Sequence, residues 1–384
     1  PPRSALFPYT TLFRSSYPIG HSRIFEGDYD GGGYLIRKGT IADDGVAQGI
    51  FGLVTGSIHN LGVENVSLST SKTDVRCGAI AGTLFGYGDE RTITRQKASM
   101  HDCYAANNTI NAPYAGGLVG EMTQAASMTH CHGYKNKLSG SNTGHIASQI
   151  LNQAKVDYSF TTGGNISANG DKNTTNCESG IDDNRMANGL MTWTLNDKTA
   201  YDVTWFQDLK GQTYPDAYPV LDKESNHVYL DNGSYTNQTT GIYSLAGEGT
   251  AEKPFLVTSV DDMKKIAKYC NGGSKSTGIH FLQTTDIDFS NVNDWDAIGH
   301  GGTFDGYYDG GGHSIRNGNI KPSSSQGDLP VSIFGVVTGT VNRLCVENTT
   351  FEVNNANDAR VGGIAARLSS KGEIKNCLVK GCKV

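Results

Sequence analysis

The sequence is poor in several features that define common classes of protein. Among 384 residues there are only 10 prolines, and no stretch approaches the roughly 18 apolar residues of a membrane-spanning helix. The eight cysteines form no Cys-x-x-Cys pair, which excludes the zinc and redox motifs with that spacing. His-Glu-x-x-His is absent, so the helix motif of metallopeptidases is missing too. The net charge is −6 and the basic residues are dispersed, which gives no electrostatic footprint for nucleic acid.

What the sequence has in abundance is glycine. Glycine accounts for 49 of 384 residues, without the period of three that collagen requires, and hydrophobic residues reach 37%. This hydrophobic content is too high for a disordered chain. Glycine scattered among Val, Ile, Thr and Asn is typical of short strands joined by tight turns. The composition therefore predicts an all-β fold.

A long internal repeat divides the chain. The stretch IFGLVTGSIHNLGVENVSL at Ile50–Leu68 returns as IFGVVTGTVNRLCVENTTF at Ile333–Phe351, with ten of nineteen positions identical. We therefore predict two tandem copies of one module, each truncated at one end. The missing N-terminal part would include any signal peptide.

A shorter repeat indicates how the strands are arranged. One phrase recurs as GAIAGTL, GGLVGEM and GGIAARL, at Gly78–Leu84, Gly116–Met122 and Gly362–Leu368. A second phrase follows it, and its central residues Cys103, Cys131 and Tyr158 recur at nearly equal intervals. A period of roughly 20–50 residues with short alternating strands is typical of a solenoid. We expect a parallel β-helix, in which each coil hydrogen-bonds to the next.

The same register assigns three of the eight cysteines. Cys103, Cys131 and Cys377 occupy the position that leucines fill in other coils, and strand alternation places this position on the inner face. We expect two inner stacks: Leu61, Cys103, Cys131 and Tyr158 in one module, and Leu344 with Cys377 in the other. A buried thiol behaves as a small hydrophobic side chain, and a disulfide or a reactive thiol is the alternative.

One copy of the short repeat resembles a known motif. Gly117-Leu118-Val119-Gly120 matches in full the GLUG repeat (Gly-Leu-any-Gly) of large bacterial surface proteins, whereas Ala79–Gly82 keeps only its last glycine. The resemblance extends over nearly the whole chain from Tyr17 onward. It implies a right-handed parallel β-helix in a secreted or surface-bound bacterial protein. Such repeats accompany IgA-protease-type metallopeptidases and adhesin-like proteins, so the resemblance is specific for architecture and weak for activity.

The chain is expected to divide into five parts. Residues 1–15 include LFPYTTLFRS, which resembles one translated frame of a sequencing adapter, so we expect them to be an artefact outside the fold. Residues 16–180 are predicted as the first module and residues 181–222 as its C-terminal cap. Residues 223–250 are polar and are predicted as a linker, and residues 251–384 as the second module.

Two segments have the periodicity of short capping helices. Asp182–Asn196 has helically spaced apolar residues behind an N-terminal aspartate. We expect it to cover the open end of the first solenoid together with Trp205–Asp222, which resembles a module-closing phrase. Thr258–Cys270 begins with Ser259 and Asp262 at capping-box positions, and we expect it to plug the N-terminal end of the second solenoid.

The most acidic phrase occurs twice, as FEGDYDGGG at Phe25–Gly33 and FDGYYDGGG at Phe304–Gly312. A calcium loop needs more oxygen ligands at fixed spacing, and an acid site needs carboxylates that recur with a partner. Only one aspartate and the glycines recur, as suits a tight turn. We predict a structural turn at Asp30, Gly31, Gly33, Asp309, Gly310 and Gly312.

Other candidates for chemistry are weaker. His130 and His132 alternate with Cys131 and could begin a metal site, although a solvated strand face is the favoured interpretation. The aromatic residues Trp205, Phe206, Tyr214 and Tyr218 could stack on a sugar, but we expect them to form the core of the cap. We expect no outer groove in which three or more of these five carboxylates converge: Asp74, Glu90, Asp102, Glu121 and Asp157.

The sequence thus favours a non-catalytic repetitive module, a shaft that carries binding surfaces of a larger secreted or cell-surface bacterial protein. We assign no catalytic residue, cofactor or metal ligand. We expect a monomer that binds an unidentified glycan or protein, with neither nucleic-acid binding nor a membrane span. Two alternatives remain: a polysaccharide lyase or glycoside hydrolase of the β-helix type, or an accessory region of a surface peptidase whose catalytic domain is missing.

Overall fold

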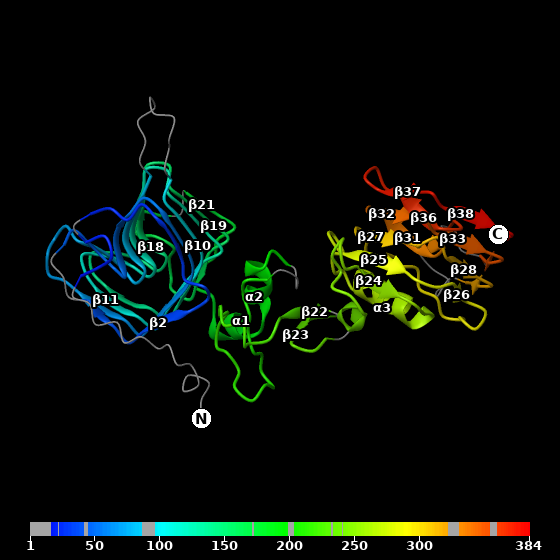
Figure 1. Cartoon of the computed structure of the whole chain (residues 1–384), viewed down its shortest axis with the longest axis horizontal. Coiled ribbons are helices and arrows are strands. Elements are labelled where there is room, and N and C mark those ends of the chain that lie inside the picture. The colour runs from blue at the N-terminus through cyan, green and yellow to red at the C-terminus, as the bar shows by residue number, and fades with distance from the viewer. Residues whose placement is uncertain are drawn as a thin grey trace. The chain divides into compact units, whose positions relative to one another are not determined.

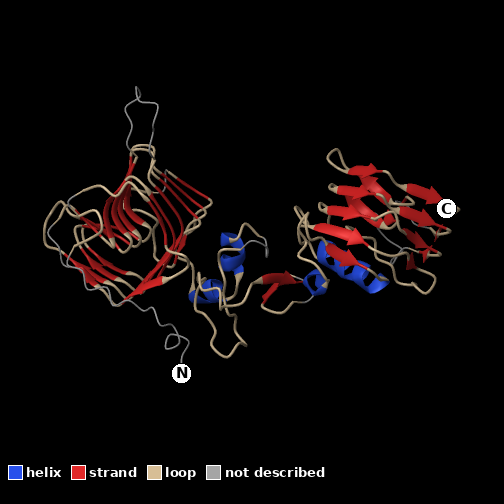
Figure 2. Cartoon of the chain, in the orientation of Figure 1, coloured by secondary structure: helices blue, strands red, loops and turns tan. Residues whose placement is uncertain are grey.

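The computed structural model of the chain describes residues 17–384, except for residues 22, 42–44, 87–96, 171–172, 199–202, 232, 240, 322–329 and 354–358. Residues 1–15, which the sequence analysis attributes to an adapter, lie outside the described residues. The chain forms two compact units, Pro1–Val228 and Tyr229–Val384. Short strands dominate both units, as Figure 2 shows.

The first unit is a solenoid of parallel strands arranged in four walls (Figure 1). The first wall contains β1 (Asp28–Asp30), β2 (Leu35–Arg37), β6 (Ser57–Glu64), β10 (Ser99–Ala106), β14 (Ser127–Thr129), β15 (His132–Tyr134), β19 (Lys155–Asp157), β20 (Phe160–Thr161) and β21 (Thr174–Thr175). The second contains β3 (Thr40–Ile41), β7 (Ser67–Ser69), β11 (Thr109–Asn111) and β16 (Lys137–Ser139). The third contains β4 (Ala47–Gln48), β8 (Arg76–Gly78), β12 (Tyr114–Gly116) and β17 (Asn142–Gly144). The fourth contains β5 (Phe51–Val54), β9 (Ala81–Phe85), β13 (Val119–Thr123) and β18 (Ala147–Ile150).

The second unit repeats this plan with fewer coils. One sheet orders β24 (Phe255–Val257), β25 (His280–Gln283), β27 (Tyr307–Asp309), β32 (Thr340–Asn342) and β37 (Glu373–Lys375). The next orders β26 (Ile287–Asp288), β28 (Ser314–Arg316), β33 (Cys345–Glu347) and β38 (Leu378–Lys380). Three further pairs close the coils: β29 (Asn319–Ile320) with β34 (Thr350–Phe351), β30 (Pro330–Val331) with β35 (Arg360–Val361), and β31 (Phe334–Val337) with β36 (Ala365–Leu368).

Part of the predicted linker has structure of its own. The unit boundary at Val228 lies within residues 223–250, and just after it β22 (Tyr229–Asp231) and β23 (Ser234–Thr236) form an antiparallel hairpin. A 3₁₀ turn at Gly241–Ser244 follows, and its Tyr243 ring packs edge-on against Tyr269.

Both solenoids are right-handed parallel β-helices, which confirms the predicted fold class. Neighbouring coils of the first unit are held in strict register, since Met128 lies beside Met100 in one coil and Val156 in the next. These side chains are buried in the interior, where each contributes roughly 1.5–3 kcal/mol through removal of apolar surface from water. The continuous interior follows from this alternation, because a one-residue slip would turn every core side chain outward.

The predicted inner stack is confirmed at three positions and wrong at one. Cys103 pairs with Leu61, and both are buried with Cys131 in the core. In the next coil His132 pairs with Phe160, so it is Ser159 that follows Cys131. Tyr158 has a left-handed φ of 41° and lies outside, its ring stacked on His130. The error arose because the sequence phrase was aligned one residue short of the true register.

The cysteines are free thiols in both units. In the second unit Leu344 and Cys377 share one position of consecutive coils, as predicted, because Asn342 pairs with Lys375 and Cys345 with Leu378. Burial raises the pKa of the Cys77 thiol to about 12. The described cysteines are all free, so the structure contains no disulfide, and Cys77, Cys103 and Cys131 are buried in the core as small hydrophobic side chains.

The repeated acidic phrase forms a corner of the solenoid in each unit, after β1 in the first and after β27 in the second. Asp30 pairs with His59, and Leu35 pairs with Gly62. Four residues therefore lie between Asp30 and Leu35, whereas two lie between His59 and Gly62 in the next coil. The carboxylate of Asp30 accepts hydrogen bonds from the backbone N–H of Gly32 (2.8 Å) and the side chain of Asn60 (3.0 Å).

The glycines of this corner have two different roles. Gly33 and Gly312 both have φ of +80°, the left-handed region that favours glycine. Gly31 and Gly310 are needed for close approach instead, because a Cβ would lie 2.4 and 2.5 Å from a carbonyl oxygen of the next coil. Asp309 accepts from Gly311 N–H at 2.9 Å, so the second copy forms the same turn.

The segment after the first solenoid (residues 181–222, here the closing segment) packs on its flank. The predicted helix is two short helices, α1 (Asp183–Ala187) and α2 (Leu190–Leu195), with Asp182 as N-cap and a break at Gly189, whose φ is 92°. One buried cluster joins this segment to first-wall residues from β10, β15 and β20. Figure 1 places α1 and α2 beside the wall, whereas the sequence analysis expected them over the open end.

The other predicted helix is present in the second unit. Helix α3 (Val260–Asn271) connects the paired strands β24 and β25, and the Ser259 hydroxyl accepts from Asp262 N–H as its N-cap. Asp262 bonds back to Thr258 at 2.9 and 3.0 Å. The apolar side chains along one side of the helix are buried: Met263, Ile266, Ala267 and Cys270.

The GLUG-type motif lies at the turn from β12 of the third wall into β13 of the fourth. Leu118 and Val119 are fully buried, and the flanking glycines leave room for neighbouring backbone. A Cβ at Gly117 would lie 2.0 Å from the His145 carbonyl oxygen, and one at Gly120 would lie 2.5 Å from the Gly82 carbonyl oxygen. The motif is therefore a packing requirement of adjacent coils in this unit.

We expect Gly120→Ala to lower the free energy of unfolding of the first unit by roughly 1–3 kcal/mol, because the added methyl group overlaps backbone that must shift. Ser148 occupies the same position one coil later, where a side chain is accommodated. Ser148→Ala removes one hydrogen bond to Asn142 and is expected to cost about 1 kcal/mol or less. Urea denaturation followed by circular dichroism tests the difference, and equal costs would contradict it.

Candidate functional site

The first wall carries a cluster of imidazoles and carboxylates on its outer face. We call Asp28, Asp30, His59, His101 and Asp102 the histidine strip. Asp30, His59 and His101 occupy one position of three consecutive coils, so the parallel register places them side by side. Asp28 precedes Asp30 by two residues and thus shares its face of β1.

The strip is held together by short polar contacts. The rings of His59 and His101 are stacked, with centroids 4.8 Å apart. His59 Nε2 lies 3.1 Å from Asp28, its Nδ1 lies 3.5 Å from Asp30, and His101 Nδ1 lies 2.9 Å from Asp102. The carboxylates of Asp28 and Asp30 are largely exposed, so a ligand could reach them from solvent.

Local contacts shift the protonation of two groups. The hydrogen bond with Asp102 raises the pKa of His101 above its ordinary value, and the nearby charges of Asp28 and Asp30 act in the same direction. The Gly32 N–H lowers the pKa of Asp30 by binding its carboxylate, and Asn60 adds to this. The strip therefore offers acceptor carboxylates beside an imidazole that keeps its proton to higher pH.

The carboxylates that the sequence analysis considered for a catalytic groove lie on different walls. Glu121 lies on β13 in the fourth wall, where Arg76 binds it at 3.3 Å, and Asp74 precedes β8 of the third wall. Asp102 and Asp157 lie on the first wall two coils apart, and Glu90 lies outside the described residues. Asp28 and Asp30, of which Asp30 was predicted only as a turn residue, do lie close to Asp102 by way of the two histidines.

The pair His130 and His132 points into two different environments. His130 lies in the corner, with Nε2 3.0 Å from Asp197. His132 is fully buried under the closing segment, its ring stacked on Tyr104 at 5.1 Å, and its Nε2–H donates to the Pro219 carbonyl at 2.8 Å. The expectation of a solvated strand face is therefore wrong for His132. Among the described residues, no three His, Cys, Asp or Glu side chains are arranged to hold a metal ion.

The closing segment buries an aromatic cluster against the first wall. Trp205 is 0% exposed, packs on Tyr104 and His132, and donates its Nε1–H to Asp102 at 3.1 Å. Tyr218 packs on the same two rings. Trp205, Phe206 and Tyr218 are thus core residues of the segment, as expected, whereas Tyr214 is 49% exposed.

A buried carboxylate lies at the centre of this interface. Glu64 is 5% exposed and accepts hydrogen bonds of 2.8 Å from Arg37 Nε, the Tyr104 hydroxyl and the Tyr218 hydroxyl. Burial raises the pKa of Tyr104 well above its ordinary value, so its hydroxyl remains a donor. A buried carboxylate paired with an arginine and two hydroxyl donors is satisfied as a structural group.

We predict that Asp102→Asn lowers the pKa of His101 toward the ordinary value of about 6.5, since the largest cause of its elevation is the Asp102 carboxylate. The amide can still accept from Trp205, so the fold should be retained. The measurement is an NMR pH titration of the His101 ring protons. An unchanged titration midpoint would show that another group sets the pKa.

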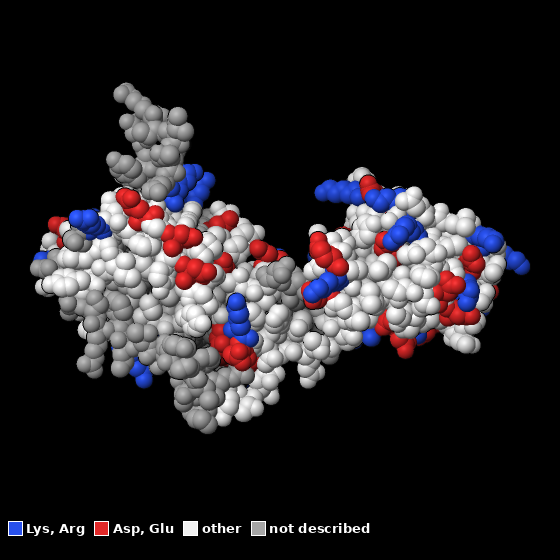
Figure 3. Space-filling view, viewed as in Figure 1, with Lys and Arg blue, Asp and Glu red and all other residues white. Residues whose placement is uncertain are grey.

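The surface has no extended field of one charge sign on the face shown in Figure 3. Acidic and basic side chains are interspersed over both units there. None of the helices formed by the described residues has the length and apolar character required to cross a membrane.

Comparison with known proteins gives one weak similarity. A stretch of 205 residues, 51% of this chain, is 25% identical to Halomucin of Haloquadratum walsbyi (strain DSM 16790 / HBSQ001). The matched stretch covers 2% of the length of Halomucin, which is a far longer protein than this chain. No family model matches the chain, and no solved structure matches it.

Proposed function

We propose that this chain is a non-catalytic structural segment of a larger secreted or cell-surface bacterial protein, with GLUG-type β-helix modules forming a shaft. The observation that supports this most is the coil-on-coil register. The recurring acidic phrase forms a corner in both units, and its carboxylates bind backbone N–H groups of their own turn. A repetitive fold built in this way is a rigid support. The similarity to part of the very long Halomucin agrees with such a role.

We further propose that the shaft carries a ligand-binding surface, and that the histidine strip is that surface in the first unit. Asp28 and Asp30 are exposed beside the His59–His101 stack, so donors and acceptors for a polar ligand stand on one face. A glycan or a polar protein loop has the hydroxyl and amide groups that such a surface binds. The expected mode is adhesion by a monomeric module.

The alternative function is that of a carbohydrate-active enzyme on a β-helix, and the same strip is the observation that favours it. An acid and a base flanking one glycosidic bond are the minimum for hydrolysis. In the strip, however, each imidazole is already bound to a carboxylate. A carboxylate on one ring nitrogen also orients a histidine that acts as a general base, so an assay of product release is what separates the two functions.

The experiment that separates the two functions uses the purified chain with a panel of plant and host glycans. We expect retention of at least one glycan that is weakened by Asp30→Asn, with no release of reducing ends or unsaturated products. Asp74→Asn, on another wall, is the matched control and should bind normally. Steady product release that Asp30→Asn or His101→Gln abolishes would establish the enzyme instead.

A further inference from the structure

One wall of the first unit has a counterpart in the second unit, and among the described residues only the first is covered by a closing segment. In the first unit, β2 follows the glycine corner and pairs with β6, so that Arg37 lies beside Glu64. In the second unit, β28 follows the same corner and pairs with β33, so that Arg316 lies beside Glu347. The outer face of β26–β28–β33–β38 is thus the counterpart of the face that the closing segment covers in the first unit.

The covered face in the first unit shows what such a wall binds. The Tyr218 hydroxyl of the closing segment donates to Glu64 at 2.8 Å. The backbone of Leu221 lies over the corner, where a Cβ at Gly33 would meet its carbonyl oxygen at 2.8 Å. Trp205 packs on Tyr104 and His132 of the wall.

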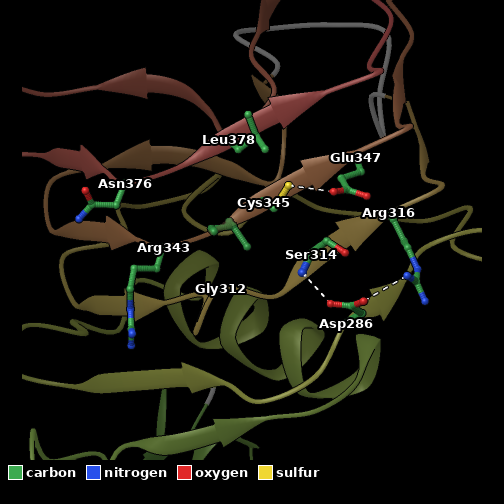
Figure 4. Close-up of a pocket in the computed structure, with 10 residues that line it drawn as sticks. Asp286, Gly312, Ser314, Arg316, Arg343, Cys345, Glu347, Asn376 and Leu378 are labelled. Atoms are coloured by element: carbon green, nitrogen blue, oxygen red, sulfur yellow. Dashed lines mark hydrogen bonds and ion pairs between the residues drawn. The ribbon is translucent and has the colours of Figure 1, made fainter.

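The same face of the second unit is an open hollow of about 560 Å³. Figure 4 shows Ser314, Cys345 and Leu378 on successive strands along it, with Gly312 at one end and Glu347 at the other side. Leu378 is 55% exposed. A Cβ at Gly312 would meet no atom within 4 Å, although the equivalent Gly33 is covered.

The hollow has an arginine and a glutamate at the same positions as the covered face, but they are paired differently, since Arg37 binds Glu64 in the first unit. Arg316 is held by Asp286 at 3.1 Å, and the Ser314 N–H donates to the same carboxylate. Glu347 occupies the position of Glu64, and its carboxylate accepts from the Cys345 thiol at 3.3 Å. A tyrosine hydroxyl, which is the donor that Glu64 receives, would be a stronger donor to Glu347 than the thiol is.

We propose that this wall of the second unit is a docking site for a second closing segment, a polypeptide of the kind formed by residues 181–222. Such a segment would place an aromatic cluster over Leu378 and Cys345 and a tyrosine hydroxyl on Glu347. Continuity with the interface of the first unit singles out this occupant, because the glycine corner, the strand register and the neighbouring Arg and Glu positions recur together. The inference is independent of whether the shaft binds a glycan.

The test appends a copy of residues 181–222 to the full chain after Val384 through a flexible Gly/Ser linker. About 20 residues of such a linker give a root-mean-square span of about 25 Å, enough to reach the hollow from the last coil. The readout is the alkylation rate of Cys345 at fixed pH, resolved from the other cysteines by peptide mass spectrometry. We expect the appended copy to slow alkylation at least tenfold and to raise the unfolding temperature of the second unit.

Two matched variants make the result specific. Trp205→Ala with Tyr218→Ala, both in the appended copy, should restore fast alkylation, and so should Leu378→Asp in the wall. Alkylation that is unaffected by the appended copy overturns the proposal, as does equal protection by the substituted copy. Sedimentation that reveals a dimer of the unmodified chain, dissociated by Leu378→Asp, would assign the hollow to a second copy of the chain and also overturn it.

Discussion

Replacing Trp205 by alanine is expected to lower the free energy of unfolding of the first unit by about 3–5 kcal/mol, the usual cost of truncating a buried tryptophan. Trp205 is 0% exposed and contacts both Tyr104 and His132, so the substitution leaves a cavity between the closing segment and the wall. It also removes the Nε1–H donor of Asp102. Because Trp205 lies between segment and wall, the segment should detach before the solenoid unfolds.

Tyr214→Ala is the matched control for this substitution. Tyr214 belongs to the same segment but is 49% exposed, so its loss should change stability by less than about 0.5 kcal/mol. Urea unfolding gives the free energies, and amide hydrogen exchange of Tyr104, Tyr134 and Phe160 reports detachment of the segment. If Trp205→Ala and Tyr214→Ala behave alike, the segment is not anchored by its buried aromatic residue.

The solenoid and its inner rows could be predicted from the sequence because both depend on local periodicity. The interval from Cys103 to Cys131 is the period of the coil itself, and alternation along a strand then fixes which side chains turn inward. Tyr158 was misplaced by one residue because an aromatic side chain at the phrase centre looks like a core residue. Its left-handed backbone is the conformation of the corner, which Asn60 and Asp102 adopt in earlier coils.

The covered flank could not be predicted because it depends on contacts between distant segments. His132 and Tyr104 are outward-facing positions of the wall, which alternation alone assigns to solvent. A signal was present nonetheless: Tyr104, Tyr134 and Phe160 give the same outer face an aromatic residue in three coils, more than a solvated face needs. The sequence contains no comparable signal for Glu64, whose partners lie as far along the chain as Tyr218.

The histidine strip was missed for a related reason. Asp30 and His59 are neighbours only because the corner of the first coil has two more residues than the corner of the second. His59 pairs with His101, but the coil between them is longer than the Cys103–Cys131 interval and includes residues 87–96. A fixed period equal to that interval therefore does not predict this pair. Differences in coil length along the sequence therefore conceal a surface cluster that the strand register makes apparent.

A drop in pH is expected to destabilise the first unit through His132. Burial lowers the pKa of His132 to about 4, so its imidazole is neutral in the folded state until the pH approaches that value. In the unfolded chain the same imidazole binds a proton near pH 6.5. Between pH 6.5 and 4 the unfolded state thus holds more protons, and the free energy of unfolding falls as the pH falls. This difference between the folded and unfolded pKa of His132 corresponds to a total change of about 3 kcal/mol in the free energy of unfolding.

The cause of this shift is visible in the surroundings of the ring. His132 lies between Tyr104 and Trp205, its Nε2–H donates to the Pro219 carbonyl, and its Nδ1 has no hydrogen-bond partner among the described residues. A proton added at Nδ1 would be a buried charge without an acceptor, which is the costly state. The contribution of neutral His132 to the free energy of unfolding is fully present above pH 6.5 and is lost below about pH 4.

His132→Phe removes the titrating group while keeping a flat ring in the cluster, where Phe160 already occupies the same position one coil later. It leaves the Pro219 carbonyl without its donor, at a cost of roughly 1 kcal/mol that does not depend on pH. We therefore expect wild type to be the more stable protein at pH 7.5 and His132→Phe the more stable at pH 4, with the two curves crossing between pH 4 and 6.5. Urea unfolding of both proteins at half-unit pH steps measures the crossing. Parallel curves over this range would mean that His132 is protonated alike in the folded and unfolded states, and that the aromatic cluster does not hold it neutral.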